Sequence, residues 1–232
     1  ICDQLDHVVF ISEQGKKYAE DLLQLSDHSS KLKVGYLGVF ENKPEKSLRS
    51  DVFTVMSCSA LIPLKRVHLI ATALKGMDQK IKWVLFGSGP ELATIMEIVK
   101  QFSPNIQFDY KGSAPNAEVI NYLANHALDL FLNTSEYEGI PLSIIEALSF
   151  GIPCIGTDTG GMKEAISHKE NGFLIPKDFR PEELAALIKN YMDLSEDAKE
   201  LFRKEAISTW KTKFNAEVNY GKICALLKAQ EK

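Results

Sequence analysis

Eight apolar runs of strand length alternate along the chain with stretches of helical periodicity. This order predicts an α/β protein with a doubly wound parallel sheet, followed by helices at the C-terminal end. The runs are continuously apolar, so we expect helices on both faces of the sheet. The expected strands span residues 7–11, 33–37, 52–57, 82–86, 106–110, 129–132, 153–156 and 172–175.

A polar segment at residues 41–51 separates the first two expected strands from the other six. We expect a domain boundary there. The part before it, residues 1–45 with the linker, is too small to bury its own faces and is expected to be the tail of a missing N-terminal domain. Residues 46–232 are expected to form the main domain. Because the pattern is already under way at Ile1, we expect the chain to be a piece of a longer protein.

Composition excludes several classes of protein. With 45% hydrophobic residues and a net charge of -4, the chain is neither disordered nor a general binder of nucleic acid. It has no run of about 18 apolar residues, so no membrane span is expected. The four cysteines form no C-x-x-C pair and the five histidines show no ligand spacing. We therefore expect no metal site, reduced thiols and a cytoplasmic location.

The most informative motif is Glu-Gly-Ile-Pro-Leu-Ser-Ile-Ile-Glu at residues 138–146. Pro141 suits the first position of a helix, which makes Ile140 the expected N-cap. Ile140 has no side-chain acceptor, so we expect the first amides of this helix, notably those of Leu142 and Ser143, to be uncapped. Uncapped amides at the positive end of a helix dipole form an anion site.

Three further residues of the motif fit a phosphate with sugars attached. Gly139 lets an anion approach the backbone closely. Glu146 lies one helical turn further on, where its carboxylate could accept hydrogen bonds from two hydroxyls of a ribose. Glu138 precedes the helix, on the side of a second sugar. In the structural alternative, Glu138 is only a partner of the helix dipole and Glu146 faces solvent.

Other segments after expected strands could contact the same ligand. Lys65 and Arg66 open an expected helix, where cations oppose the dipole, so a phosphate role is as well supported as a solvated pair. Lys111, Gly112 and Ser113 follow another strand and could present backbone groups to a base, or could form a simple turn.

Two glycine-containing loops allow similar alternatives. Residues 87–90, Gly-Ser-Gly-Pro, form either a phosphate loop or a tight turn. Leu92 stands where a dinucleotide fingerprint has a third small residue, which argues against a nicotinamide oxidoreductase. Residues 157–161 could touch a sugar.

Taken in order, these motifs resemble a known family. The E-x7-E spacing of residues 138–146 is followed by Ala-Leu-Ser-Phe-Gly-Ile-Pro at 147–153 and Gly-Gly-Met-Lys-Glu at 160–164. This series resembles the C-terminal donor-binding domain of retaining glycosyltransferases of the GT-B fold. The family is group 1, or glycosyltransferase family 4-like, and includes mannosyl- and glucosyltransferases of surface-polysaccharide biosynthesis. The similarity runs from about residue 52 to residue 175.

The ends of the chain extend this resemblance. Residues 7–25 resemble the closing strand and helix of the family's first, acceptor-binding domain. The last helix, from about Phe214, resembles the one that crosses back to that domain.

The resemblance implies a role for each motif residue. Glu146 would bind the ribose, the amides near Leu142 and Ser143 the diphosphate, and Lys111–Ser113 the base. Glu138, which contacts the donor sugar, and Lys65, which contacts the phosphates, would be catalytic. The full nucleotide-sugar-binding set is Lys65, Arg66, Lys111, Gly112, Ser113, Glu138, Gly139, Ile140, Leu142, Ser143 and Glu146.

The implied reaction moves a hexose from a nucleotide-diphosphate sugar to an acceptor glycan or lipid-linked glycan, with retention and without a metal or other cofactor. This chain would be the donor-binding half, hardly active alone, in a protein that is cytoplasmic or peripheral to the membrane. One departure from the family is Ser59-Ala60 in place of a Gly-Arg pair; Arg66 could replace the missing cation.

Two other functions remain open from the residues. One is a non-catalytic nucleotide- or nucleotide-sugar-binding module. The other is a glycoside hydrolase that uses Glu138 and Glu146 as its carboxylate pair, although an uncapped helix start suits a phosphate better than a bare glycoside.

Overall fold

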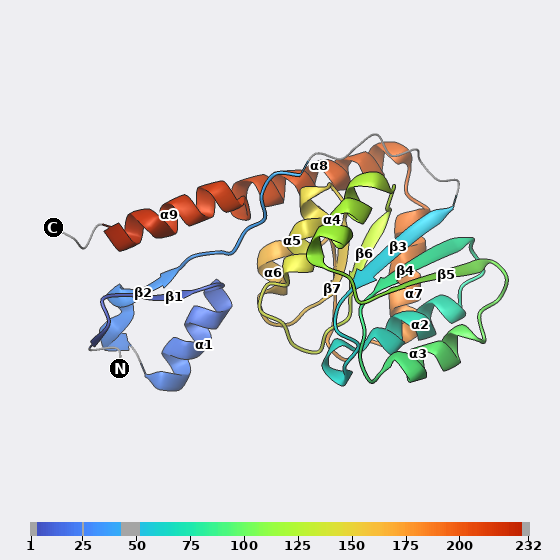
Figure 1. The fold of residues 1–232 in the computed structure, drawn as a ribbon, viewed down its shortest axis with the longest axis horizontal. Coiled ribbons are helices and arrows are strands. Elements are labelled where there is room, and N and C mark those ends of the chain that lie inside the picture. The colour runs from blue at the N-terminus through green and yellow to red at the C-terminus, as the bar shows by residue number, and fades with distance from the viewer. Residues whose placement is uncertain (1–3, 25, 43–51, 229–232) are drawn as a thin grey trace.

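A six-stranded parallel sheet forms the centre of the larger of two units in the computed structural model, which describes residues 4–24, 26–42 and 52–228 (Figure 1). The strand order is β5-β4-β3-β6-β7-β8, and every neighbouring pair is parallel. The strands are β3 (Phe53–Cys58), β4 (Ile81–Phe86), β5 (Ile106–Gly112), β6 (Leu130–Asn133), β7 (Cys154–Thr157) and β8 (Gly172–Ile175).

Helices cover both faces of this sheet, as the continuously apolar strands predict. Successive strand residues point to opposite faces, so Val55 packs in one buried cluster and Met56 in the other. One face is covered by α2 (Val67–Lys75), α3 (Leu92–Val99) and α7 (Pro181–Met192). The other is covered by α4 (Asn116–Asn125), α5 (Leu142–Ser149), α6 (Met162–Ala165) and α8 (Glu196–Lys213).

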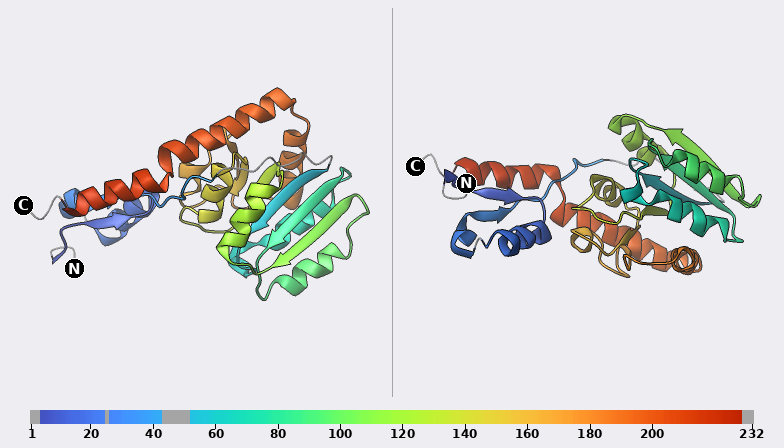
Figure 2. Two further views of the ribbon diagram at one scale, coloured as in Figure 1. Left: turned by 45° about the horizontal axis from the view of Figure 1, so that its top comes forward. Right: turned by 90° about the horizontal axis from the view of Figure 1, so that it is seen from below.

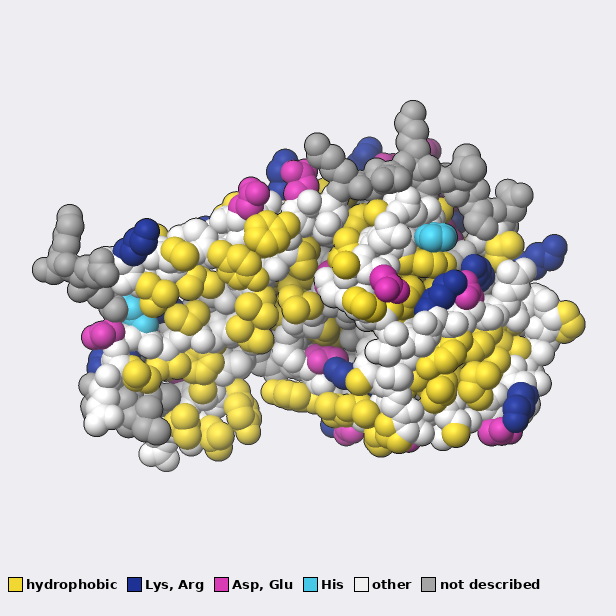
Figure 3. Space-filling view, viewed as in Figure 1, with side chains coloured by type: hydrophobic (Ala, Val, Ile, Leu, Met, Phe, Trp, Pro, Cys, Tyr) yellow, Lys and Arg dark blue, Asp and Glu magenta, His cyan; other side chains and the backbone are white. Residues whose placement is uncertain are grey.

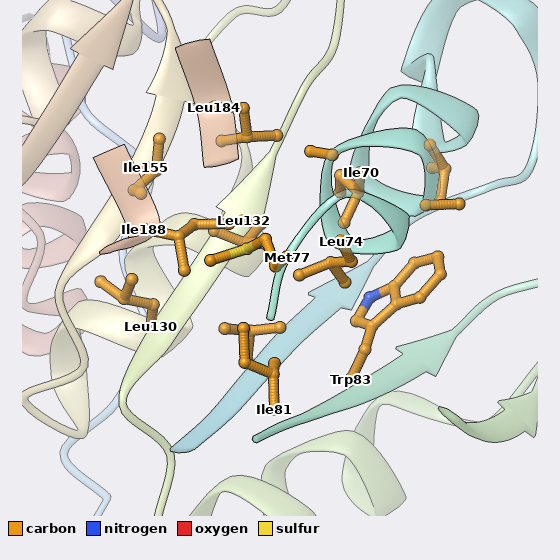
Figure 4. Close-up of a cluster of buried hydrophobic side chains, with 14 of the residues drawn as sticks. Ile70, Leu74, Met77, Ile81, Trp83, Leu130, Leu132, Ile155, Leu184 and Ile188 are labelled. Carbon is orange, nitrogen blue, oxygen red and sulfur yellow. The ribbon is translucent and has the colours of Figure 1, made fainter. Parts of the chain in front are cut away.

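The core beneath α2 and α7 is shown in Figure 4. Ile70 and Leu74 of α2 meet Trp83 of β4, whose side chain is fully buried. Leu184 and Ile188 approach the same sheet face from α7. The Trp83 indole N–H donates to Ser57 Oγ at 2.9 Å, so burial leaves no polar atom of this ring unsatisfied.

A smaller unit at the N-terminal end has its own two-stranded parallel sheet. It consists of β1 (Val8–Phe10), α1 (Glu13–Leu23), the 3-10 segment η2 (Ser26–Lys31) and β2 (Leu32–Val34). The last helix, α9 (Ala216–Lys228), runs back alongside this unit (Figure 2). Asn219 Nδ2 donates to Leu37 O at 3.3 Å, and Tyr220 OH donates to Gly38 O at 3.2 Å.

The predicted order of strands and helices is confirmed, but several local predictions are wrong. The strand predicted at residues 33–37 ends at Val34. The strand predicted to end at residue 110 continues through Gly112, so Lys111 lies within β5. The predicted helix at Lys65-Arg66 is preceded by a 3-10 turn, η3 (Pro63–Lys65), and α2 begins only at Val67. The N-cap of α5 is Pro141 instead of Ile140, because Pro141 still has an extended ψ of 130°.

The predicted linker at residues 41–51 lies mostly outside the described residues, so the domain boundary stays a prediction. Among the residues that are described, no helix is long and apolar enough to span a membrane.

Candidate active site

The loops after β3, β4, β5, β6 and β7 meet at one edge of the sheet because all these strands are parallel. A cavity of about 330 Å³ opens between the first three of these loops. Its lining includes Cys58, Ser59, Gly87 and Ser113. In the described ranges, no three His, Cys, Asp or Glu side chains converge as a metal site would require.

The first turn of α5 lies at the centre of this edge, after β6. No side chain caps the helix. The amides of Ile144 and Ile145 bond to Pro141 O at 3.1 and 3.3 Å. The amides of Leu142 and Ser143 have no acceptor within the residues the structure describes. These two N–H groups can bind an anion from solvent.

Glu138, in the loop before α5, forms an ion pair with Lys65 through Lys65 Nζ and Glu138 Oε1. Both side chains are mostly buried, with 20% of Lys65 and 14% of Glu138 exposed. Ser135 Oγ donates to the same carboxylate oxygen at 2.7 Å. The backbone N–H of Ser135 in turn donates to Asn133 Oδ1 at 3.0 Å. Sequence reasoning missed Ser135, although a polar run directly after a buried strand was a usable signal.

Glu146 lies within α5, and the residue is only 6% exposed. The solvent-facing alternative for Glu146 is therefore wrong. Asn116 Nδ2, at the start of α4, donates to Glu146 Oε1 at 2.8 Å. Burial raises the pKa of Glu146, and the Asn116 bond partly offsets that rise. Asn116 was also missed, because no spacing along the chain links it to Glu146.

Cys58 ends β3 within reach of the same carboxylate. Burial, followed by the charge of Glu146, raises the pKa of the Cys58 thiol to about 11. The thiol is therefore neutral at physiological pH.

Of the three residues predicted to meet a base, Lys111 and Gly112 lie within β5 and Ser113 follows it. The Lys111 ammonium pairs with Asp109 Oδ1 at 2.9 Å and lies 5.5 Å from the centre of the Tyr122 ring. Burial tends to raise the pKa of Asp109, but hydrogen bonds from Lys82 and Lys111 hold it below its usual value. Gly112 O accepts from Gly87 N at 2.7 Å, and Ser113 lines the cavity.

The Arg66 guanidinium is held by backbone carbonyls of two loops at this edge of the sheet. Its Nε donates to Thr134 O at 2.9 Å and its Nη1 to Lys177 O at 2.7 Å. The guanidinium carbon also lies 5.4 Å from the centre of the Phe179 ring, and burial lowers the pKa of Arg66. The sequence suggested the Arg66 guanidinium as a ligand of the donor phosphates. In the structure it donates to backbone carbonyls.

Two glycines allow loops to pack closely around the site. At Gly160 (φ 56°), a Cβ would lie 1.5 Å from Glu138 O, so only glycine lets residues 157–161 rest on the Glu138 backbone. At Gly89 (φ 154°), a Cβ would lie 2.3 Å from Leu61 O. The turn at residues 87–90 therefore packs on the loop after β3.

A hollow separates the smaller unit from the main body on the face shown in Figure 3. The residues lining a cavity of about 480 Å³ between α1 and the loop after β7 include Glu13, Asp158 and Lys163. Glu164 joins the two sides: its carboxylate accepts from the amides of Glu13 and Gln14 at 2.9 and 3.0 Å, and from Tyr36 OH at 2.8 Å.

An uncapped helix start at the carboxyl edge of a parallel sheet is a common feature of nucleotide-binding α/β proteins. Residues 39–208 match the family "Glycosyl transferases group 1", and the chain belongs to this family. It is 34% identical over 134 residues to N-acetyl-alpha-D-glucosaminyl L-malate synthase of Bacillus anthracis. This match covers 57% of this chain and 34% of that protein.

A longer match, 25% identical over 226 residues, is to the putative colanic acid biosynthesis glycosyltransferase WcaL of Escherichia coli K12. It covers 91% of this chain and 54% of that protein, so the chain spans about half of WcaL's length.

Solved structures show the same fold. Anabaena Alr3699/HepE in complex with UDP and glucose superposes with a TM-score of 0.79 at 24% identity, over 96% of this chain and 63% of that chain. The pneumococcal O-GlcNAc transferase GtfA in complex with UDP and GlcNAc has a TM-score of 0.77 at 21% identity, over 99% of this chain and 46% of that chain. The predicted α/β architecture of GT-B glycosyltransferases is confirmed.

Proposed function

We propose that this chain is the donor-binding half of a retaining hexosyltransferase that uses a nucleotide-diphosphate sugar. The observation that carries the proposal is the uncapped start of α5, which has one carboxylate in the loop before it and a second within the helix. Glu138 pairs with Lys65, and Glu146 is buried against Asn116.

Each part of the donor has a proposed place along this edge. The base enters the cavity after β3, β4 and β5, next to the backbone of Lys111, Gly112 and Ser113. The ribose hydroxyls donate to Glu146, which lies within the α5 segment that starts at the phosphate site. The transferred sugar lies at Glu138, beside the loop that contains Gly160.

The diphosphate takes the centre of the site. The amides of Leu142 and Ser143 donate to its oxygens, and the backbone of Gly139 and Ile140 lies alongside. The Ile140 side chain is only 6% exposed and packs in the core, so only its backbone can contribute. When the donor binds, Lys65 exchanges its pairing with Glu138 for the phosphates, which frees Glu138 for the hydroxyls of the sugar.

These groups stabilise the leaving diphosphate. During transfer the bond between the anomeric carbon and the phosphate oxygen breaks, and its electrons leave with the nucleoside diphosphate. The acceptor oxygen bonds to the same face of that carbon and its hydroxyl proton is released. Each prearranged donor aimed at the developing charge contributes about 3 kcal/mol. In this proposal the helix amides and Lys65 supply that charge stabilisation without a metal or other cofactor.

The acceptor, a glycan or lipid-linked glycan, is proposed to bind through a further domain to which residues 1–45 belong. This choice of acceptor is supported by WcaL, a putative glycosyltransferase of colanic acid biosynthesis. We place the whole protein in the cytoplasm, at the membrane surface when the acceptor is lipid-linked. The chain alone is then expected to bind the donor with little turnover.

A thermal-shift series with UDP, GDP, ADP, CMP and their sugar conjugates tests donor binding. A ligand at 100 times its dissociation constant adds about 2.7 kcal/mol, which raises the Tm by roughly 5–10 °C for a chain of this size. At the same ligand concentration the shift should fall by about half or more in Glu146→Ala and persist in Glu97→Ala, whose side chain is 68% exposed. Absence of a shift with every nucleotide contradicts the proposal.

Retention is tested on the protein with its acceptor domain. The NMR coupling of the product's anomeric proton should match that of the donor sugar. Donor binding without any transfer would instead support a non-catalytic nucleotide-sugar-binding module.

A further inference from the structure

Arg66 has a backbone conformation that long side chains rarely adopt. Its φ of 49° and ψ of 35° lie in the left-handed region, between the end of η3 and the start of α2. A residue is held in this region only when its surroundings fix it. Its backbone is bonded on both sides, since the Arg66 amide donates to Pro63 O at 3.1 Å and Arg66 O accepts from the Leu69 amide at 2.9 Å, and the side chain makes further contacts.

The guanidinium spans the carboxyl ends of three neighbouring strands. From the turn after β3 it reaches Thr134 O after β6 and Lys177 O after β8, at 2.9 and 2.7 Å. Its Nη2 lies 3.5 Å from Oγ1 of Thr157, at the end of β7. These strands are consecutive in the sheet, so one side chain ties together the loops after β6, β7 and β8.

Thr134 completes this connection in the opposite direction. Its hydroxyl lies 3.0 Å from Lys65 O and 3.1 Å from Arg66 O and can donate to either. The amide of Glu136 also donates to Leu64 O at 2.8 Å. The backbone on both sides of Lys65 is thus held against the loop that carries Glu138.

The surroundings of this guanidinium suit a cation held by the protein. Its partners are carbonyl oxygens and the face of Phe179, and Glu136 lies close enough to favour its charged form. Glu136 also pairs with Lys177 at 3.0 Å. Carbonyl and carboxylate oxygens repel a phosphate, so the electrostatics favour a structural role for Arg66.

We propose that Arg66 is a positioning residue. It braces the loops after β6, β7 and β8 against the η3 turn and thereby directs the Lys65 side chain towards Glu138. The bracing contacts do not depend on a ligand, whereas their effect on ligand binding rests on the proposed function.

Hydrogen exchange tests the brace without any ligand. Arg66→Gly removes the side chain and also relieves the left-handed backbone. It should speed exchange of the Glu136 amide at least tenfold, as should Thr134→Val. Arg180→Gly is the matched control, because Arg180 is 78% exposed and Gly is tolerated at its N-cap position. Unchanged exchange in Arg66→Gly overturns the proposal.

Binding of UDP, GDP and ADP tests the effect on Lys65 by a double-mutant cycle. For the best ligand, Arg66→Gly should raise the Kd about tenfold in the wild-type background. In a Lys65→Ala background the same change should raise it less than twofold. Arg66→Lys keeps the charge but loses the planar fork, and should not restore affinity.

Equal losses in both backgrounds, or full affinity in Arg66→Lys, would show that Arg66 acts on the phosphates by its own charge. If the wild type binds no nucleotide, the proposed function fails, and the exchange rates still decide whether the brace exists.

Discussion

At the scale of single residues, the proposed role of Glu146 conflicts with the stability of the fold. Burial raises the pKa of its carboxylate, so the folded chain holds this proton more readily than the unfolded chain. The charged carboxylate therefore lowers the free energy of unfolding once the pH exceeds the pKa of Glu146 in the unfolded chain. This loss grows until the pH exceeds the raised pKa of Glu146 in the folded chain. A ribose-binding carboxylate explains why such a costly group is present.

Glu146→Gln should therefore stabilise the empty protein at pH 7. The amide oxygen can still accept from Asn116, and no charge is buried. We expect a gain of about 1 kcal/mol, or ~2–4 °C in Tm, that shrinks as the pH falls towards 4. Thermal unfolding from pH 4 to 8 measures it, with the exposed Glu97→Gln as control. A loss of stability at pH 7 would contradict this account of Glu146.

Cys58 should react slowly with iodoacetamide. With its pKa at about 11, roughly one thiol in a thousand is ionised at pH 8. The exposed Cys224 should be alkylated first, and the Cys58 rate should rise about tenfold per pH unit up to its pKa. Peptide mass spectrometry over time gives both rates. Equal rates at pH 8 would show that Cys58 is not in the buried, carboxylate-flanked environment described above.

At the scale of elements, the first turn of α5 should tolerate a proline that removes one proposed phosphate ligand. Leu142 is 46% exposed, its amide makes no bond within the helix, and Pro141 before it is already extended. Leu142→Pro should keep the Tm within a few degrees and weaken nucleoside diphosphate binding about tenfold. Calorimetry measures both, with Glu196→Pro at the start of α8 as control. Unchanged affinity would remove this amide from the site.

The same helix shows what sequence can and cannot predict. Its uncapped start and the face shared by Glu146 and Ser143 follow from local rules of helix geometry, although its N-cap is one residue later than predicted. The bond from Asn116 to Glu146 joins positions 30 apart, and the contacts of Arg66 reach 111 residues along the chain. No local rule predicts such partners, because they depend on which loops the sheet order brings together. The Arg66 guanidinium was consequently suggested for the phosphates.

At the scale of the whole molecule, the Glu164 carboxylate fastens the smaller unit to the main body by accepting three hydrogen bonds. Bonds to a charged acceptor contribute about 1.5–3 kcal/mol each when buried, and less at this partly exposed site. Glu164→Ala should speed hydrogen exchange at the amides of Glu13 and Gln14 at least tenfold, while Glu170→Ala on an exposed loop should not. Identical exchange in both variants would show that other contacts hold the unit.

We propose that Glu146 recognises the ribose of a donor whose diphosphate lies at the start of α5. Titration calorimetry of UDP, GDP and ADP, each compared with its 2′-deoxy form, measures this recognition. Loss of one hydrogen bond to a charged group weakens binding by roughly 10–150-fold. The wild type should show such a preference for the ribonucleotide, and the ratio of the two affinities should be near one in Glu146→Ala. Equal affinity for a ribonucleotide and its 2′-deoxy form in the wild type would contradict this proposal.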